Sequence, residues 1–221
     1  MKLLIMFNFQ NAGRPVMEEI HLFHDCILII INMIALGSGL ALYLLTNQHH
    51  TNRATTEAQA IEFAWTILPA FVVAIISYPS LRLLYMVDDA IGVRITVKAL
   101  GHQWYWLYDY PDGPRFNSYL LPGRYRLLET DMRLTLPASQ ITQILVTAAD
   151  VLHSWTVPTM AVKADAIPGR VNKLSLVPKR PGIYYGQCRE ICGSNHTFIP
   201  IRIEVVFILN TNLKFAVDKE G

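Results

Sequence analysis

Two long apolar runs dominate the first 90 residues of the chain. Residues 26–45 and residues 63–81 contain no charged side chain. A helix of either length rises roughly 30 Å at 1.5 Å per residue, which matches the hydrocarbon core of a bilayer. A buried core helix is the alternative for each run, but charge-free runs this long are typical of membrane spans. Pro69 and Pro79 fit this interpretation, because neighbouring helices make proline tolerable in a membrane.

The connector between the two runs, residues 46–62, is short and polar. It predicts an antiparallel hairpin with both ends on one side of the membrane. Arg53 is its only basic residue, so the positive-inside rule says little about orientation. Residues 1–9 resemble the start of a signal peptide, but Asn8 interrupts the apolar run and no small-residue cleavage site follows. We expect this segment to be retained.

Beyond residue 90 the apolar positions alternate with polar ones over short stretches. This pattern occurs in residues 91–98, 142–147 and 201–205. Alternation with a period of two is typical of strands that bury one face, and frequent Pro and Gly residues separate these stretches. No internal repeat is present. The sequence therefore predicts an antiparallel sandwich or barrel after the hairpin.

Composition supports a membrane-anchored α+β protein in two parts. Hydrophobic residues make up 52% of the chain and charged residues only 16%, whereas a soluble domain is about 25% charged. Residues 1–90, the N-terminal segment and hairpin, carry four basic and seven acidic residues. Residues 91–221, the all-β domain, carry the other fifteen basic and ten acidic residues. The net charge of +2 excludes a strong nucleic-acid binder.

The chemistry concentrates near the end of the chain. Cys188, Cys192 and His196 follow one another at intervals of four residues. Two thiols and an imidazole this close can bind a soft or borderline metal, although a local disulfide or two inert thiols are the alternatives for the cysteine pair. The third cysteine, Cys26, lies in the first apolar run, where it is interpreted as a small apolar residue.

One upstream histidine completes the pattern. His153 lies in the segment DVLHSWTVP, and the order of one early histidine followed by a late Cys and His loop is typical of copper-binding β-sandwiches. A mononuclear blue-copper site needs one cysteine and two histidines with a weak axial ligand. A second cysteine four residues away allows both thiolates to bridge two copper ions. The histidines that flank the apolar runs are interpreted as surface or interfacial residues: His21, His24, His49 and His50.

Eight motifs together identify the family that the chain resembles. They are FHD from Phe23, EFAWTILPA from Glu62, PSLRLLYM from Pro79, GHQWYW from Gly101, RLLETD from Arg126, DVLHSWTVP from Asp150, KADAIPGR from Lys163 and YYGQCREICGSNHTFIP from Tyr184. Over essentially its whole length the chain resembles subunit II of mitochondrial cytochrome c oxidase, a proton-translocating enzyme of the respiratory chain.

The resemblance implies a two-helix anchor in the mitochondrial inner membrane and a cupredoxin-like domain in the intermembrane space. That domain would carry the binuclear copper centre CuA, accept electrons from cytochrome c and pass them to the haems of subunit I. By motif match, Cys188 and Cys192 would bridge the copper ions, and His153 and His196 would be the terminal ligands. Glu190 would give its backbone carbonyl to copper and its side chain to a magnesium ion shared with subunit I.

The resemblance also implies two further functional residues. Trp104 matches the residue at which electrons from cytochrome c enter, and Glu62 matches the carboxylate at the mouth of a proton pathway on the matrix side. From pattern alone, Trp104 fits ordinary packing beside Tyr105 and Trp106. Glu62 also fits a carboxylate favoured by the macrodipole at a helix start. Other partners implied are the remaining oxidase subunits and membrane lipid.

The chain departs from the family pattern in two respects. Ile199 stands where the family has a methionine as the weak axial copper ligand. The segment after GHQWYW is short and keeps few of the carboxylates expected to attract cytochrome c. Those that remain, with the arginines among them, are Asp109, Asp112, Glu129, Asp131, Arg115, Arg124 and Arg126.

Two alternative functions follow from these departures. Ile199 supports a structural subunit with an altered or lost copper centre. A quinol-oxidase counterpart is the other alternative, but it would lack Cys188 and Cys192. The chain contains no CxxCH haem-attachment motif, so we expect the electron donor to be a separate protein.

Overall fold

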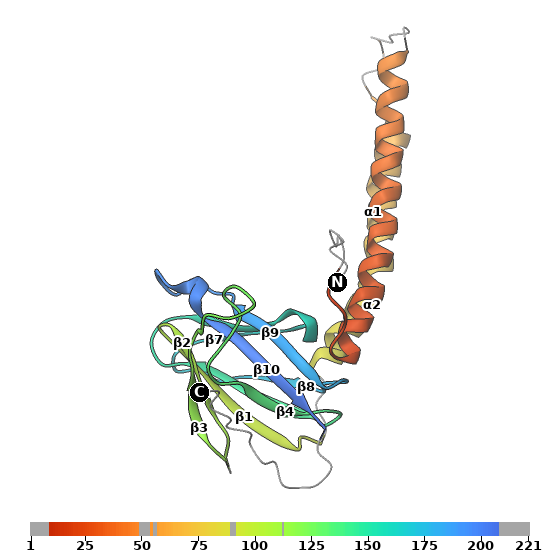
Figure 1. Cartoon of the computed structure of the whole chain (residues 1–221). Helices are drawn as coiled ribbons and strands as arrows, with labels where there is room; N and C mark the ends of the chain where they lie inside the picture. Colours follow the sequence, from red (N-terminus) through yellow and green to blue (C-terminus); the bar gives the residue numbers. More distant parts are fainter. Residues whose placement is uncertain (1–8, 49–53, 55–56, 89–91, 112, 208–221) are drawn as a thin grey trace. The chain divides into compact units, whose positions relative to one another are not determined.

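The computed structural model describes residues 9–48, 54, 57–88, 92–111 and 113–207 (Figure 1). The helices are α1 (Pro15–Asn47), α2 (Gln59–Asp88) and the short 3-10 helices η1 (Pro158–Met160) and η2 (His196–Phe198). The strands are β1 (Ile95–His102), β2 (Tyr105–Asp109), β3 (Arg115–Ser118), β4 (Leu134–Pro137), β5 (Thr142–Ala148), β6 (His153–Val157), β7 (Val162–Ala166), β8 (Asn172–Leu176), β9 (Gly182–Cys188) and β10 (Pro200–Val206).

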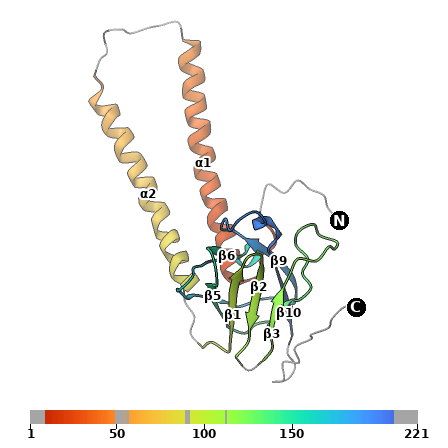
Figure 2. The same cartoon turned by 90° about the vertical axis from the view of Figure 1, so that its left-hand side faces the viewer.

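The described residues form two compact units. Residues 19–86 form one unit, and the residues before Glu19 group with those from Val87 onward in the other. Within the first unit, α1 and α2 run in opposite directions as a hairpin (Figure 2). Each helix has a fully exposed stretch, of mean hydropathy 2.3 in α1 and 2.0 in α2, which is long and apolar enough to cross a bilayer. The prediction of a two-helix anchor is therefore confirmed.

The prolines of the two helices occupy different positions. Pro15 is the first residue of α1, a position where the missing N–H is not needed for an intrahelical bond. Pro69 and Pro79 lie inside α2, which continues through both of them. Both helices extend beyond the uncharged runs, so each carries polar turns outside the apolar segment.

The other unit is a β-sandwich. One sheet has the strand order β3-β2-β1-β5-β8 and the other has the order β4-β10-β9-β6-β7. Most neighbouring strands are antiparallel, but β1 pairs with β5 and β10 pairs with β4 in parallel. The strands predicted at 142–147 and 201–205 are confirmed as β5 and β10, whereas the strand predicted at 91–98 overlaps β1 only from Ile95 onward. In β5 buried and half-buried residues alternate without a break, as the sequence pattern indicates.

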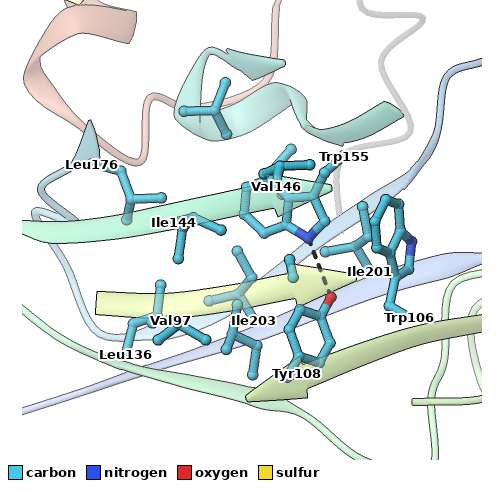
Figure 3. Close-up of a cluster of buried hydrophobic side chains, with 14 of the residues drawn as sticks. Val97, Trp106, Tyr108, Leu136, Ile144, Val146, Trp155, Leu176, Ile201 and Ile203 are labelled. Carbon is cyan, nitrogen blue, oxygen red and sulfur yellow. Dashed lines mark hydrogen bonds between the residues drawn. The ribbon is translucent and has the colours of Figure 1, made fainter. Parts of the chain in front are cut away.

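Aromatic and branched side chains from both sheets fill the space between them (Figure 3). Trp106 and Tyr108 from β2 face Trp155 from β6, and all three are fully buried. The indole N–H of Trp155 donates a hydrogen bond of 3.2 Å to the Tyr108 hydroxyl, which joins the two sheets. This rigid core supports the ends of the strands that carry the candidate ligands.

The segment before α1 packs on the sandwich. The N–H of Gly13 donates to the carbonyl of Thr159 at 2.7 Å, and the N–H of Lys179 donates to the carbonyl of Gly13 at 2.9 Å. The Arg14 guanidinium donates to the carbonyl of Ser175 at 2.7 Å, and its burial lowers the pKa of Arg14 to about 10. Lys179 also forms a 2.8 Å ion pair with Glu18 in the first turn of α1.

Candidate metal centre

The predicted ligands begin at the ends of two neighbouring strands. His153 is the first residue of β6 and Cys188 is the last residue of β9. These strands pair in opposite directions, with Trp155 opposite Cys188, so the start of β6 meets the end of β9. The Nδ1 atom of His153 consequently lies 3.9 Å from the Cys188 sulfur, and both side chains are buried.

The loop after β9 returns the second cysteine and the second histidine to the same place. The sulfur of Cys192 lies 3.5 Å from Nδ1 of His196, the first residue of η2. His153, Cys188 and Cys192 form a buried group. One ring nitrogen of His153 and the two sulfurs all lie within 4.8 Å of one another. His196 reaches this group through its contact with Cys192.

The two cysteines are free thiols. Burial raises the pKa of Cys188, but hydrogen bonds with His153 and with the backbone outweigh it, so the net pKa is lowered. Burial and the neighbouring Cys188 raise the pKa of Cys192 to about 12. Two thiolates this close repel each other unless a cation lies between them. At neutral pH Cys192 therefore stays a thiol, and both sulfurs become thiolates only when a bound cation offsets their repulsion.

Backbone groups hold the cysteine loop in place. The Cys188 sulfur lies 3.3 Å from the carbonyl oxygen of Glu190, so that carbonyl points toward the ligand group. The N–H of Cys188 donates to the carbonyl of Ile199 at 3.1 Å. The Ile199 side chain is 1% exposed and belongs to the core, so a hydrocarbon fills the position after η2.

Asp150 is a partner of His153 that the sequence analysis did not single out. Its Oδ1 atom lies 2.8 Å from Nε2 of His153, the ring nitrogen that faces away from Cys188. Burial raises the pKa of Asp150, but hydrogen bonds from His153, Gln103 and Val151 outweigh it and lower the net pKa. Ligand histidines usually bond a carboxylate or carbonyl through the second ring nitrogen, so a carboxylate only three residues before His153 was the available signal for this role.

Trp104 lies in the turn between β1 and β2 and is half-buried. Its neighbour Gln103 donates from its side-chain amide to the carbonyl of Cys192 at 2.9 Å, and from its backbone N–H to Asp150 Oδ2 at 2.6 Å. A Cβ atom at Gly193 would lie 3.3 Å from Cζ2 of Trp104, so the indole ring lies over this glycine. The structure thus brings Trp104 to the cysteine loop.

Glu62 lies elsewhere, in the first turn of α2. It is exposed, and its carbonyl accepts a 2.9 Å hydrogen bond from the Thr66 hydroxyl. Its position at a helix start agrees with both sequence interpretations, the pathway carboxylate and the macrodipole. It belongs to the helical unit, whereas the ligand group belongs to the sandwich.

Two of the remaining carboxylates form ion pairs or hydrogen bonds within the sandwich. Glu129 is buried and forms a 3.1 Å ion pair with Arg202. One oxygen of Asp131 accepts hydrogen bonds of 2.7 Å from two backbone N–H groups, those of Tyr119 and Met132. Asp112 lies outside the described residues. The face around these strands therefore offers few carboxylates to a basic partner.

Comparisons with known proteins agree with this geometry. Residues 3–83 match the family model described as the transmembrane domain of cytochrome c oxidase subunit II, and residues 95–206 match the model of its periplasmic domain. The chain belongs to the cytochrome c oxidase subunit II family. It is therefore an oxidase subunit that works in complex with other subunits, and the family's function is to carry the CuA centre.

Two relatives illustrate the match. Cytochrome c oxidase subunit 2 of Choristoneura rosaceana is 48% identical over 212 residues, which cover 92% of this chain and 93% of the relative. The crystal structure of the periplasmic domain of subunit II of cytochrome oxidase (CoxB) of Bradyrhizobium japonicum is 41% identical and covers 54% of this chain and 88% of that domain, with a TM-score of 0.53. The β-sandwich of this subunit II chain therefore has the fold of the family's periplasmic domain.

Proposed function

We propose that this chain holds the family's two copper ions with Cys188 and Cys192 as bridging thiolates and His153 and His196 as terminal ligands. The carbonyl of Glu190 would be a further ligand. The observation that carries the proposal is the buried group of His153, Cys188 and Cys192, whose ligand atoms lie within 4.8 Å of one another. When bound, the copper ions supply a one-electron couple between a donor protein and the haems of the oxidase.

The donor set suits a soft or borderline metal such as copper and does not suit magnesium or calcium. Thiolate and imidazole are soft and borderline donors, whereas magnesium and calcium prefer oxygen. The lowered pKa of Cys188 favours the thiolate that a metal requires. A bound cation would also stabilise the Cys192 thiolate, whose pKa is raised to about 12 by burial and by Cys188.

Electrons would reach the centre from cytochrome c through Trp104. The packing of its indole over Gly193 and the hydrogen bond of 2.9 Å from Gln103 to the Cys192 carbonyl support this role. We expect Trp104→Ala to slow electron transfer into copper while leaving the affinity for cytochrome c nearly unchanged. Loss of binding alone would contradict the proposal, and Tyr105→Phe is the neighbouring control.

A magnesium ion would bind the Glu190 carboxylate at the interface with subunit I. The Glu190 carbonyl points toward Cys188, so this residue would contact copper through its backbone and magnesium through its side chain. Glu62 would open a proton pathway on the matrix side of the helical unit. Both roles predict selective losses: Glu190→Gln should lower magnesium content, and Glu62→Gln should slow proton uptake with copper content unchanged.

The anchor would lie in the mitochondrial inner membrane with the sandwich in the intermembrane space. The bonds of Gly13 with Thr159 and Lys179 tie the segment before α1 to the sandwich, which supports placing both on one side. Protease added to mitochondria without their outer membrane should degrade the sandwich. If the sandwich is protected and the chain is cut near Arg53, the orientation in the membrane is the opposite one.

The deciding experiment is the metal content of the purified complex. We expect two copper ions per chain, with mixed-valence signals in the electron paramagnetic resonance and near-infrared spectra. Cys188→Ser and Cys192→Ser should remove these signals, and Cys26→Ser, the third cysteine, should retain them. Less than one copper per chain in the unsubstituted complex would favour the alternative, a structural subunit with a lost centre, which Ile199 alone supports.

A further inference from the structure

A cavity of about 310 Å³ lies between α1 and α2, within the helical unit. Its walls are one stripe from each helix, with residues three or four positions apart that share a helix face. The stripe of α1 runs from Glu19 to Ile30, and the stripe of α2 runs from Ile75 to Met86. Because the helices are antiparallel, Glu19 lies level with Met86, and Ile30 lies level with Ile75.

The two ends of this cavity differ in chemistry. The end formed by Ile27, Ile30, Ile75 and Ile76 is entirely aliphatic, and it lies within the uncharged runs that cross the hydrocarbon core. Pro79 also lines the cavity and offers no N–H to the carbonyl four residues earlier. This part of the cavity suits a flexible hydrocarbon chain.

The opposite end carries two charges of opposite sign. Arg82 is the first charged residue after the uncharged run of α2, so it lies at the boundary between hydrocarbon and headgroups. Glu19 lies level with Met86, four residues and thus about 6 Å farther from the hydrocarbon than Arg82. Neither side chain has an ion-pair partner among the described residues.

We propose that this cavity binds one molecule of phosphatidylethanolamine. From the bilayer outward, the cavity presents an apolar slot, a guanidinium and a carboxylate. The lipid presents an acyl chain, a phosphate and a primary ammonium group in the same order. Arg82 donates charge-assisted hydrogen bonds to the phosphate, and Glu19 accepts them from the ammonium.

The chemistry of the two charges selects this lipid among those of a membrane. A choline headgroup has no N–H to donate to Glu19, and an anionic headgroup without an amine would be repelled by that carboxylate.

Native mass spectrometry of the purified oxidase complex tests the proposal. The complex is exchanged into micelles containing phosphatidylethanolamine and phosphatidylcholine with identical acyl chains, and the lipid that stays bound is counted. We expect about a tenfold preference for phosphatidylethanolamine, the effect of one charge-assisted hydrogen bond. Glu19→Gln should abolish the preference, and Arg82→Gln should lower retention of both lipids about tenfold.

Matched variants separate lipid binding from misfolding. Ile76→Trp should fill the slot and remove the lipid, whereas Val73→Trp, on an exposed position that does not line the cavity, should retain it. Arg94→Gln is the charge control outside the cavity. A phosphatidylethanolamine with a photoreactive acyl chain should crosslink to residues of the two stripes. Three outcomes would overturn the proposal. The unsubstituted complex could retain the two lipids equally, the lipid could crosslink only outside the stripes, or Cys26 could crosslink to a partner subunit.

Discussion

The carboxylate of Asp150 lies 2.8 Å from Nε2 of His153, while the other ring nitrogen of that histidine lies 3.9 Å from the sulfur of Cys188. The aspartate therefore fixes which nitrogen faces the ligand group. Its second oxygen accepts the N–H of Gln103 at 2.6 Å, so the aspartate is itself held in position. Carboxylates that orient ligand histidines in this way raise the basicity of the imidazole.

We expect Asp150→Asn to weaken copper retention by about 10- to 100-fold, the usual effect of losing such a partner. Competition with a copper chelator, followed by elemental analysis, measures this loss. Asp109→Asn is the control, because Asp109 lies on β2 and makes no contact with the ligand histidine. Identical chelation curves for Asp150→Asn and the unsubstituted complex would refute the positioning role.

Gly193 is expected to control the position of Trp104. Gly193 has a φ of +117°, and an added Cβ would lie 3.3 Å from Trp104 and 3.2 Å from Gln103. Gly193→Ala should displace the indole and slow electron transfer from cytochrome c about tenfold or more, because contact geometry limits the rate. Gly169→Ala is the control: its φ is +78°, but a Cβ added there would meet no atom of the described residues within 4 Å. If both variants slow electron transfer equally, backbone strain and not the contact with Trp104 is the cause.

Ile199 is expected to affect the properties of the copper centre and not its assembly. The side chain is 1% exposed, and an exchange for methionine conserves volume at a cost below about 1.5 kcal/mol. Ile199→Met should therefore leave the copper content unchanged while it shifts the midpoint potential and makes the two copper ions more equivalent in the paramagnetic resonance spectrum. Mass spectrometry must first show isoleucine at 199, because some mitochondrial codes translate an isoleucine codon as methionine. Unchanged potential and spectrum would contradict the axial position.

The ion pair of Glu129 and Arg202 should contribute to the stability of the sandwich. The pair is 3.1 Å long, with side chains 11% and 16% exposed. Arg202→Met leaves a buried carboxylate whose remaining donor among the described residues is the Tyr185 hydroxyl, at 3.3 Å. It should cost about 3 kcal/mol in unfolding free energy. Glu204→Gln, which breaks the longer and more exposed pair of 3.6 Å with Arg133, should cost under about 1 kcal/mol. Chemical denaturation measures both free energies of unfolding, and equal losses for the two variants would contradict the prediction.

Alkaline pH should destabilise the sandwich through its buried phenols. Burial raises the pKa of Tyr108 far above its ordinary value, more than the hydrogen bond from Trp155 lowers it. The unfolded phenol loses its proton near pH 10 and the folded one does not, so this stability is complete below pH 10 and declines above it by about 1.4 kcal/mol per pH unit. Tyr108→Phe should make the decline shallower, whereas Tyr119→Phe, on the surface, should not. Denaturation curves from pH 9 to 11 measure the two slopes.

The local pattern of the chain was sufficient to predict its architecture. The apolar runs at 26–45 and 63–81 lie within α1 and α2, and the alternating residues 142–147 and 201–205 lie within β5 and β10. Hydrophobic periodicity has this power because it records which faces are buried. The same pattern gave no sign that the segment before α1 binds to the sandwich, since those bonds join Gly13 to residues more than 140 positions away.

The residue types and spacing also named the candidate ligands, because two thiols and two imidazoles in this order have few other uses. Only the tertiary structure decided how they are held. Asp150 reaches Gln103 across 47 residues, and Gln103 reaches Cys192 across 89. Such contacts depend on β6 pairing with β9 and on the turn after β1, and strand pairing follows from the packing of the whole core and not from any local segment.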